Sequence, residues 1–347
     1  MSVDLVGSTA FKGGAGEATV KTSAHPMWVD EIGKFYREFP ATFRRRFGEQ
    51  AATTKPIVDF GPRVWKTVGD EIIFCCRVLS LDHVVCVVEA FIQSLDDYGR
   101  VLDSRGKHLD VKGAAWLAAF PAPNVTIEIF HSDQSSTIDL GDEELERRAD
   151  AEPHKFDFLG KSIDCGFRLA KFSSADKLIL SAELALALCE SDSSNGVRFR
   201  RDFNYPGREE LKGVIAGRPY PIVTIDTQRS PLRREVFALE RQIIGPPTVK
   251  AVPLGVLLRK LMEDEGIEPA VLFDAGAELS EKRYPRSYAE FRSIWLAVAT
   301  EAQKREEIEA HAAAAPDDAD GGLPQEVEAA LDEFVSPETT PLVPPAK

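Results

Sequence analysis

The sequence from residue 64 to residue 79 reads VWKTVGDEIIFCCRVL, and it contains two runs rich in β-branched and aromatic residues. A Gly-Asp pair, Gly69 and Asp70, separates the two runs. Such a pair between two strand-forming segments is a strong short-range signal of a tight hairpin. The stretch therefore predicts a β-hairpin that carries an acidic side chain at its tip.

The first residues of the chain predict another strand. Residues 2–6 form an apolar run that is too short for a helix, and the polar turn sequence Gly7, Ser8, Thr9 follows it. The backbone N–H groups of this turn, which would open a loop or a helix, are suited to bind phosphate oxygens.

Asp4 lies near the end of this first strand, and Asp70 lies at the hairpin tip. Ends of neighbouring strands can bring two carboxylates within a few ångströms, and like charges that close require a cation between them. Ligands that are all oxygen favour Mg²⁺ or Mn²⁺ over Zn²⁺. The pair predicts metal-assisted chemistry on a nucleoside triphosphate, while a simple turn role for each aspartate is the competing interpretation.

Helical and strand patterns alternate up to about residue 226, which predicts one α+β or α/β domain. Within it, residues 28–47 have helical spacing, and Pro40 is expected to kink or divide that helix. A helical extension is expected over residues 227–309, with helices at 231–244, 254–263 and 288–302. Residues 310–347, rich in Ala, Asp, Glu and Pro, are expected to be a disordered tail.

The composition excludes several function classes. The 42 Lys and Arg against 56 Asp and Glu give a net charge of 42 − 56 = −14, which disfavours nucleic-acid binding. No apolar stretch approaches the roughly 18 residues of a membrane helix. The five cysteines include the adjacent Cys75 and Cys76, which is not a disulfide framework, so a cytoplasmic location is expected.

Three stretches taken together resemble the class III nucleotide cyclases. These are VDLVGST at residues 3–9, KTVGDE at residues 66–71 and DFLGKSIDCGFR at residues 157–168. The resemblance covers residues 1–226 and implies an α+β catalytic domain with a ferredoxin-like βαββαβ core sheet.

The resemblance also implies a role for individual residues. Two Mn²⁺ or Mg²⁺ ions would be held by Asp4, the Leu5 carbonyl and Asp70. The substrate would be bound by Gly7, Ser8 and Thr9 at the triphosphate, Lys66 and Asp157 at the base, and Lys212 at the β- and γ-phosphates. Arg168 would stabilise charge on the α-phosphate, and Asp164 stands where the family has an asparagine that orients the ribose. In the family these sets come from two subunits, which implies a head-to-tail homodimer with composite sites.

The layout resembles one subgroup, the bacterial pyrimidine cyclases of the Pycsar anti-phage defence system. This similarity predicts conversion of UTP to 3′,5′-cyclic UMP and pyrophosphate, with the product acting on a separate cyclic-nucleotide-responsive effector. The chemistry of Lys66 and Asp157 permits adenine as well as uracil, so an adenylate cyclase stays an alternative. A catalytically inactive cyclase-like interaction module is the other alternative, and the sequence lacks the Gly-Gly-Asp/Glu-Glu-Phe hairpin of a diguanylate cyclase.

Overall fold

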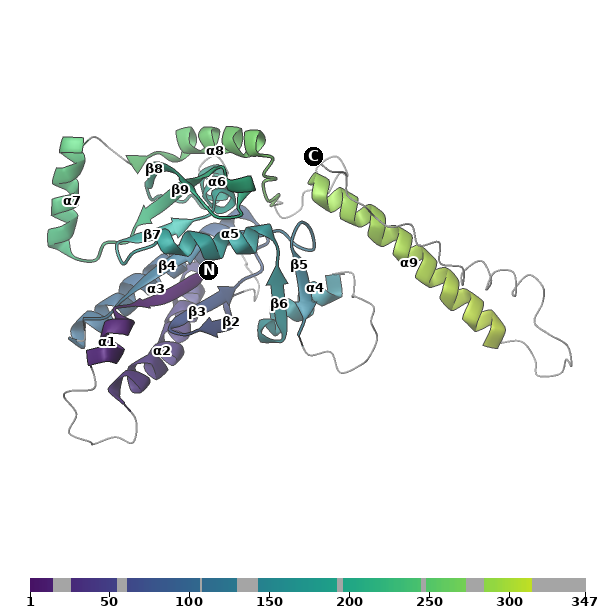
Figure 1. The fold of residues 1–347 in the computed structure, drawn as a ribbon, viewed down its shortest axis with the longest axis horizontal. Helices are drawn as coiled ribbons and strands as arrows, with labels where there is room; N and C mark the ends of the chain where they lie inside the picture. The colour runs from purple at the N-terminus through teal and green to yellow at the C-terminus, as the bar shows by residue number, and fades with distance from the viewer. Residues whose placement is uncertain are drawn as a thin grey trace, which may run out of the picture. The chain divides into compact units, whose positions relative to one another are not determined.

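The structure, a computed structural model, describes residues 1–14, 26–54, 61–106, 108–129, 143–191, 196–244, 248–272 and 284–313 (Figure 1). The chain divides into two compact units after Ala289, and helix α9 (Arg286–Ala313) crosses that division. The predicted tail lies outside the described residues from residue 314 onward. The sheet and the candidate site belong to the first unit.

The first half of this unit is a ferredoxin-like βαββαβ arrangement. Its elements are β1 (Ser2–Val6), α2 (Met27–Ala51), β2 (Arg63–Val68), β3 (Glu71–Cys75), α3 (Leu81–Ser104) and β4 (Asp110–Ala115). The strands lie in the order β4-β1-β3-β2, and each neighbouring pair is antiparallel. This topology confirms the predicted α+β fold and the predicted hairpin, whose turn is Gly69-Asp70.

The second half extends the same sheet on the β4 side. Its elements are β7 (Lys177–Leu180), α6 (Ala182–Ser191), β8 (Phe203–Glu210), β9 (Pro219–Asp226) and β10 (Thr248–Val249). The full order is β10-β8-β9-β7-β4-β1-β3-β2, and the join is the parallel pairing of β4 with β7. One sheet of eight strands therefore runs through both halves.

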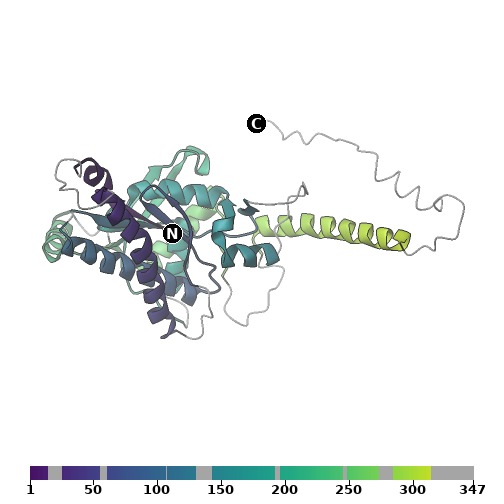
Figure 2. The same ribbon diagram turned by 90° about the horizontal axis from the view of Figure 1, so that it is seen from below.

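Helices α2 and α3 pack against each other and cover one face of the sheet (Figure 2). The phenylalanine side chains along α2 are buried there and pack on rings of β3 and α3. The ring centroids of Phe43 and Phe74 are 5.2 Å apart, and those of Phe39 and Phe91 are 6.1 Å apart. Pro40 was expected to kink or divide this helix, and the division is wrong, because α2 is continuous from Met27 to Ala51. Buried phenylalanines on both sides of Pro40 hold the two turns against the same core, which outweighs the hydrogen bond that proline removes.

Strand alternation directs the other face of the sheet toward the candidate site. Val3 and its register partner Ile72 belong to the core under α2 and α3. Successive side chains of a strand point to opposite faces, so the next pair, Asp4 with Glu71, points to the other face of the sheet. Lys112 of β4, paired with Asp4, shares that face. The polar side chains of β1, β3 and β4 are therefore gathered where α2 and α3 do not reach.

A two-stranded sheet lies beside β2. It consists of β5 (Val125–Glu128) and β6 (Phe156–Leu159), with helices α4 (Glu143–Ala151) and α5 (Lys161–Leu169) next to it. A second, smaller core joins it to the main sheet, and Trp65 donates its indole N–H to the Phe156 carbonyl at 2.9 Å. This contact fixes β6 against β2.

The segment after β9 contributes to the first unit. Helix α7 (Pro231–Ile244) matches its predicted bounds, β10 pairs with β8, and α8 (Ala251–Glu265) packs on α6. Part of the expected C-terminal extension is thus built into the sheet and its cover. Within the described residues, no helix is long and apolar enough to cross a membrane.

Candidate active site

The two predicted metal ligands meet at one end of β1. The pairing of Asp4 with Glu71 places Asp4 beside the hairpin turn, and the Leu5 N–H donates to the Asp70 carbonyl at 3.3 Å. Gly69 adopts a φ of 62°, a left-handed conformation that glycine allows at little energetic cost. The structure therefore brings Asp4 and Asp70 together, as the sequence predicted from their positions at two strand ends.

Both carboxylates line a pocket of ≈ 450 Å³. Its other lining residues are Leu5, Val6, Gly7, Ser8, Thr9, Lys112, Ser173, Ser174 and Ala175. Leu5 and the three turn residues predicted to contact a triphosphate are thus here. Lys112 and residues 173–175 were not predicted to lie here. Lys112 reaches the pocket because β4 pairs with β1, and residues 173–175 reach it because they precede β7, which pairs with β4. Local sequence patterns do not reveal such long-range pairing.

Gly7 is required by the shape of this turn. Its φ is 86°, and a Cβ added there would lie 2.9 Å from the His108 carbonyl oxygen. The short helix α1 (Ser8–Gly14) begins immediately afterwards, with the Phe11 N–H donating to the Gly7 carbonyl at 2.9 Å. A residue with a Cβ would collide with this carbonyl and require the turn to shift.

Two lysines accompany the carboxylates. The Lys112 ammonium lies 3.2 Å from Asp4 Oδ2, and the Lys12 ammonium lies 3.5 Å from Asp70 Oδ1. Ser8 also donates its hydroxyl to Asp70. Burial raises the pKa of the neighbouring Glu71, and the Asp4 carboxylate adds to that rise. The two carboxylates of the pocket are therefore each paired with an ammonium group.

The donor set of this pocket fits Mg²⁺ or Mn²⁺. Two aspartates supply only oxygen, and among the described residues no cluster of three or more His, Cys, Asp or Glu side chains forms a complete metal cage. Mg²⁺ is usually bound by one or two carboxylates together with substrate phosphates. Asp4, Asp70 and the Leu5 carbonyl are accordingly the residues that would hold the ions, with a triphosphate completing the coordination.

The predicted base-reading pair is also brought together, from two different sheets. The Lys66 ammonium on β2 donates to Asp157 Oδ1 on β6 at 2.7 Å, and each side chain keeps about a third of its surface exposed. The Asp157 carboxylate also accepts from the Phe158 N–H at 3.1 Å, and the ammonium lies 3.8 Å from the Trp65 ring centroid. Donor and acceptor are thus presented side by side at a partly open surface.

Helix α5 carries the next set. Gly160, with a φ of 140°, begins the helix, and a Cβ there would lie 2.4 Å from Asn124 Oδ1. The Asn124 amide oxygen accepts from the Ser162 N–H at 3.1 Å, which docks the first turn on the loop before β5. Asp164 and Arg168 follow one helical turn apart, with Asp164 exposed and Arg168 half-buried.

The loop that carries Lys212 passes close to Arg168. A Cβ on Gly213 would lie 3.7 Å from a guanidinium nitrogen of Arg168, so the loop after β8 passes next to this side chain. Lys212 is exposed on that loop. The five residues Lys66, Asp157, Asp164, Arg168 and Lys212 do not line the pocket of Asp4 and Asp70.

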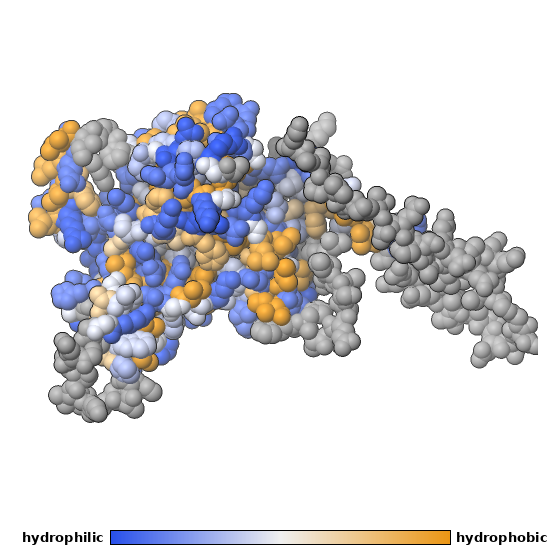
Figure 3. Space-filling view, viewed as in Figure 1, coloured by the Kyte–Doolittle hydropathy of each residue, from blue (hydrophilic) through white to orange (hydrophobic). Residues whose placement is uncertain are grey.

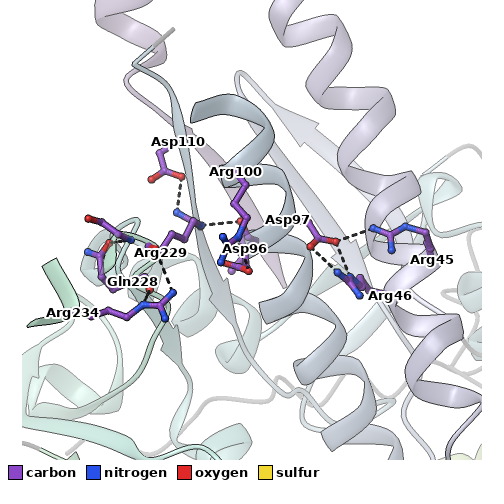
Figure 4. Close-up of polar contacts among 11 residues, drawn as sticks. Arg45, Arg46, Asp96, Asp97, Arg100, Asp110, Gln228, Arg229 and Arg234 are labelled. Carbon is purple, nitrogen blue, oxygen red and sulfur yellow. Dashed lines mark hydrogen bonds and ion pairs between the residues drawn. The ribbon is translucent and has the colours of Figure 1, made fainter. Parts of the chain in front are cut away.

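A buried arginine supports the wall of the pocket from behind (Figure 4). The Arg229 guanidinium donates to Asp110 at 2.6 Å, Leu95 O at 3.0 Å, Val111 O at 3.1 Å and Ala175 O at 3.2 Å. It thereby ties α3, the start of β4 and the pocket wall together. Burial lowers the pKa of Arg229, and the Asp110 carboxylate opposes that change.

A second hollow, of ≈ 690 Å³, lies between α2, α3 and the segment after β9. Four arginines line it, and each already has a partner: Arg46 bonds Asp97, Arg100 bonds Asp96, Arg201 bonds Glu89 and Arg234 bonds the Gln228 carbonyl. Its charges are satisfied internally, so we assign no ligand to it.

No protein-family model and no curated protein sequence matches the chain. Among solved structures it is similar to the adenylyl cyclase CyaB from P. aeruginosa, with 14% identity over 65% of this chain and 90% of that one, at a TM-score of 0.39. It is also similar to the guanylyl cyclase Cya2, with 13% identity over 65% and 88% at 0.35. A third is the guanylate cyclase domain of RhGC from Catenaria anguillulae in complex with GTP, with 10% identity over 66% and 94% at 0.38.

Proposed function

We propose that the chain is a nucleotide cyclase, which converts a nucleoside triphosphate into a 3′,5′-cyclic nucleotide and pyrophosphate, with UTP as the preferred substrate. The observation that carries the proposal is the convergence of Asp4 and Asp70 with the Gly7 turn in one pocket. Paired carboxylates beside a turn that opens a helix are suited to a metal-bound triphosphate.

In the proposed reaction the 3′-oxygen of the substrate forms a bond to the α-phosphorus. The bond from that phosphorus to the bridging oxygen breaks, pyrophosphate leaves, and the 3′-hydroxyl proton passes to solvent. Two divalent ions, when bound, would activate the hydroxyl and neutralise the leaving group. Asp4 and Asp70 would hold these ions together with the Leu5 carbonyl.

The remaining polar residues would act on the substrate directly. Arg168 would stabilise the charge that develops on the α-phosphate, because preorganised positive charge acts most strongly at that point. Lys212 beside it would bind the β- and γ-phosphates, and Asp164 would accept a hydrogen bond from the ribose. Because these residues do not line the pocket of Asp4 and Asp70, we infer composite sites in a head-to-tail homodimer.

Base choice would rest on Lys66 and Asp157. The ammonium can donate to O4 of uracil and the carboxylate can accept from N3–H, while adenine would use N1 and the N6 amine in the same way. The preference for uracil follows from the resemblance to the Pycsar cyclases. That resemblance extends the proposal to a defence signal, cyclic UMP, acting on a separate effector.

An inactive cyclase-like module is the second candidate, and one observation favours it. Lys112 is paired with Asp4 and Lys12 with Asp70. A protein that binds no metal ions there would need such neutralisation of the two carboxylates. Asp164 in place of asparagine also adds negative charge to the site of the ribose.

Product analysis separates these candidates. Purified protein with Mn²⁺ is incubated separately with ATP, GTP, CTP and UTP, and the products are identified by mass spectrometry. Cyclic UMP as the main product supports the proposal. Cyclic AMP would show that the substrate is ATP and not UTP. If no nucleotide gives a product, the inactive module is favoured. Asp70→Asn should abolish turnover, whereas Asp103→Asn, on the exposed face of α3, should not change it.

Subunit mixing tests the composite site. Asp4→Ala and Arg168→Ala proteins are each expected to be inactive, and their mixture should regain up to one working site per heterodimer. Mixtures that exchange subunits and stay inactive would show that each site lies within one chain.

A further inference from the structure

Helix α7 presents a stripe of apolar side chains to solvent (Figure 3, orange over α7). The stripe consists of Leu232, Val236, Leu239 and Ile243, which are 44–84% exposed. Their spacing of four, three and four residues is the heptad spacing of a coiled-coil seam, with Leu at the d positions and β-branched residues at the a positions. Such a seam is suited to pack against a second helix of the same kind.

The start of the helix is anchored, while nearly all of its described side chains, including the stripe, are exposed. Ser230 caps its first turn, with its hydroxyl accepting from the Arg233 N–H at 3.4 Å and its carbonyl accepting from the Arg234 N–H at 3.0 Å. On the opposite side of α7, the Arg234 guanidinium donates to the Gln228 carbonyl at 2.7 Å. Next to it Arg229 anchors the preceding residues in the core. These contacts hold the first turn of α7 and leave the stripe accessible to a partner.

The charges that flank the seam indicate which partner fits. With Leu232 and Leu239 at d, Arg233 and Glu240 occupy e positions and Glu235 occupies a g position. Two parallel copies of α7 would place Glu235 against Glu240 of the other copy, which is repulsive. Two antiparallel copies would pair Val236 with Leu239 and place Arg233 opposite Glu240, twice by symmetry.

We propose that α7 pairs antiparallel with α7 of a second copy of this chain, through a two-fold contact separate from the candidate active site. The helix has 14 residues, or about 21 Å of length, so the seam is short. An interface of this size is expected to be weak and to depend on protein concentration. It would join two molecules, or two catalytic dimers, into a larger assembly.

Sedimentation velocity of the full chain over a concentration series tests this contact. Leu239→Glu should lower the weight-average mass at high concentration toward half of the unsubstituted value and remove its dependence on concentration. Val256→Glu, at a side chain that is 56% exposed on α8, is the matched control and should leave the mass unchanged.

A charge swap tests the antiparallel direction. Arg233→Glu alone and Glu240→Arg alone should each weaken the assembly, because each places like charges across the seam. The double variant R233E/E240R should restore it, since both ion pairs are reformed with reversed polarity. The proposal is overturned if Leu239→Glu leaves the weight-average mass unchanged. If the mass is unchanged and only the thermal stability falls, another part of the same chain covers the stripe, and the proposal is overturned as well. An additive loss in the double variant would overturn the antiparallel pairing.

Discussion

Gly99 on α3 leaves the space through which the side chain of Arg229 passes. A Cβ at position 99 would lie 2.4 Å from Arg229 Nε and 2.7 Å from its Cδ and Cζ. The guanidinium is held by four carbonyl or carboxylate partners and is only 11% exposed, so it has no room to shift by an ångström. Gly99→Ala is therefore expected to expel the Arg229 side chain.

The size of the effect follows from two opposing contributions. Replacing glycine by alanine inside a helix stabilises by about 1 kcal/mol. Losing a buried, paired charge destabilises by about 3–5 kcal/mol, and the lower end applies because Asp110 is partly exposed and regains water. The variant should be less stable by about 2 kcal/mol. In an Arg229→Ala background the obstacle is gone, so the same substitution should stabilise by about 1 kcal/mol.

Urea denaturation of the wild-type, the two single variants and the double variant measures this reversal of sign. Gly48→Ala on α2 is the matched control, because nothing lies within 4 Å of a Cβ there and a gain of about 1 kcal/mol is expected. If Gly99→Ala stabilises the unsubstituted chain as Gly48→Ala does, the guanidinium does not lie under α3 and the reasoning fails.

Three further outcomes are expected. The Arg46 guanidinium, with help from Arg45, lowers the pKa of Asp97, so the stability this carboxylate contributes is present above its unfolded pKa of about 3.9 and is lost as the pH falls through the folded value. In urea denaturation, the free energy of unfolding of Asp97→Asn should accordingly be about 1–2 kcal/mol lower than that of the wild-type at pH 7. Near pH 2 the two stabilities should converge. An equal deficit at both pH values would contradict the ion pair. Burial raises the pKa of Cys75 and Cys165 to about 12. Iodoacetamide at pH 8 should therefore label both thiols slowly in the native protein and quickly in urea, as followed by mass spectrometry. Fast labelling of the native protein would show that these thiols are accessible. Gly166→Ala should destabilise by about 1–3 kcal/mol in thermal or urea unfolding, because its Cβ would lie 2.3 Å from the Trp116 ring; a gain like that of Gly48→Ala would refute this packing.

Local chemistry made the strong elements predictable. The Gly69-Asp70 turn determined the hairpin, and Ser230 followed by Pro231 determined the start of α7. In contrast, β8 was missed because its sequence FNYPGREE contains Pro206 and Gly207, which resemble a turn. In the sheet these residues occupy an irregularity in the register with β9, and long-range pairing supports the strand around them.

Site prediction had the same limit. The motif residues Asp4, Asp70, Lys66 and Asp157 were identified in advance, and the structure places them in two pairs. Lys112 was not identified, although its alternation with the buried Val111 marked it as facing away from the core. Knowing that it faces Asp4 required the register of β1 with β4, two strands more than a hundred residues apart in sequence.

The parallel pairing of β4 with β7 has a consequence for synthesis on the ribosome. All strands of the ferredoxin-like half are available once residue 115 has emerged, but the outer edge of β4 finds its partner only when residue 180 has followed, 180 − 115 = 65 residues later. At about 5–20 residues per second this leaves the edge open for roughly 3–13 s. An open strand edge is a template for pairing with other chains. Asp110 and Lys112, which place charge along β4, lessen that risk while the nascent chain waits for its second half.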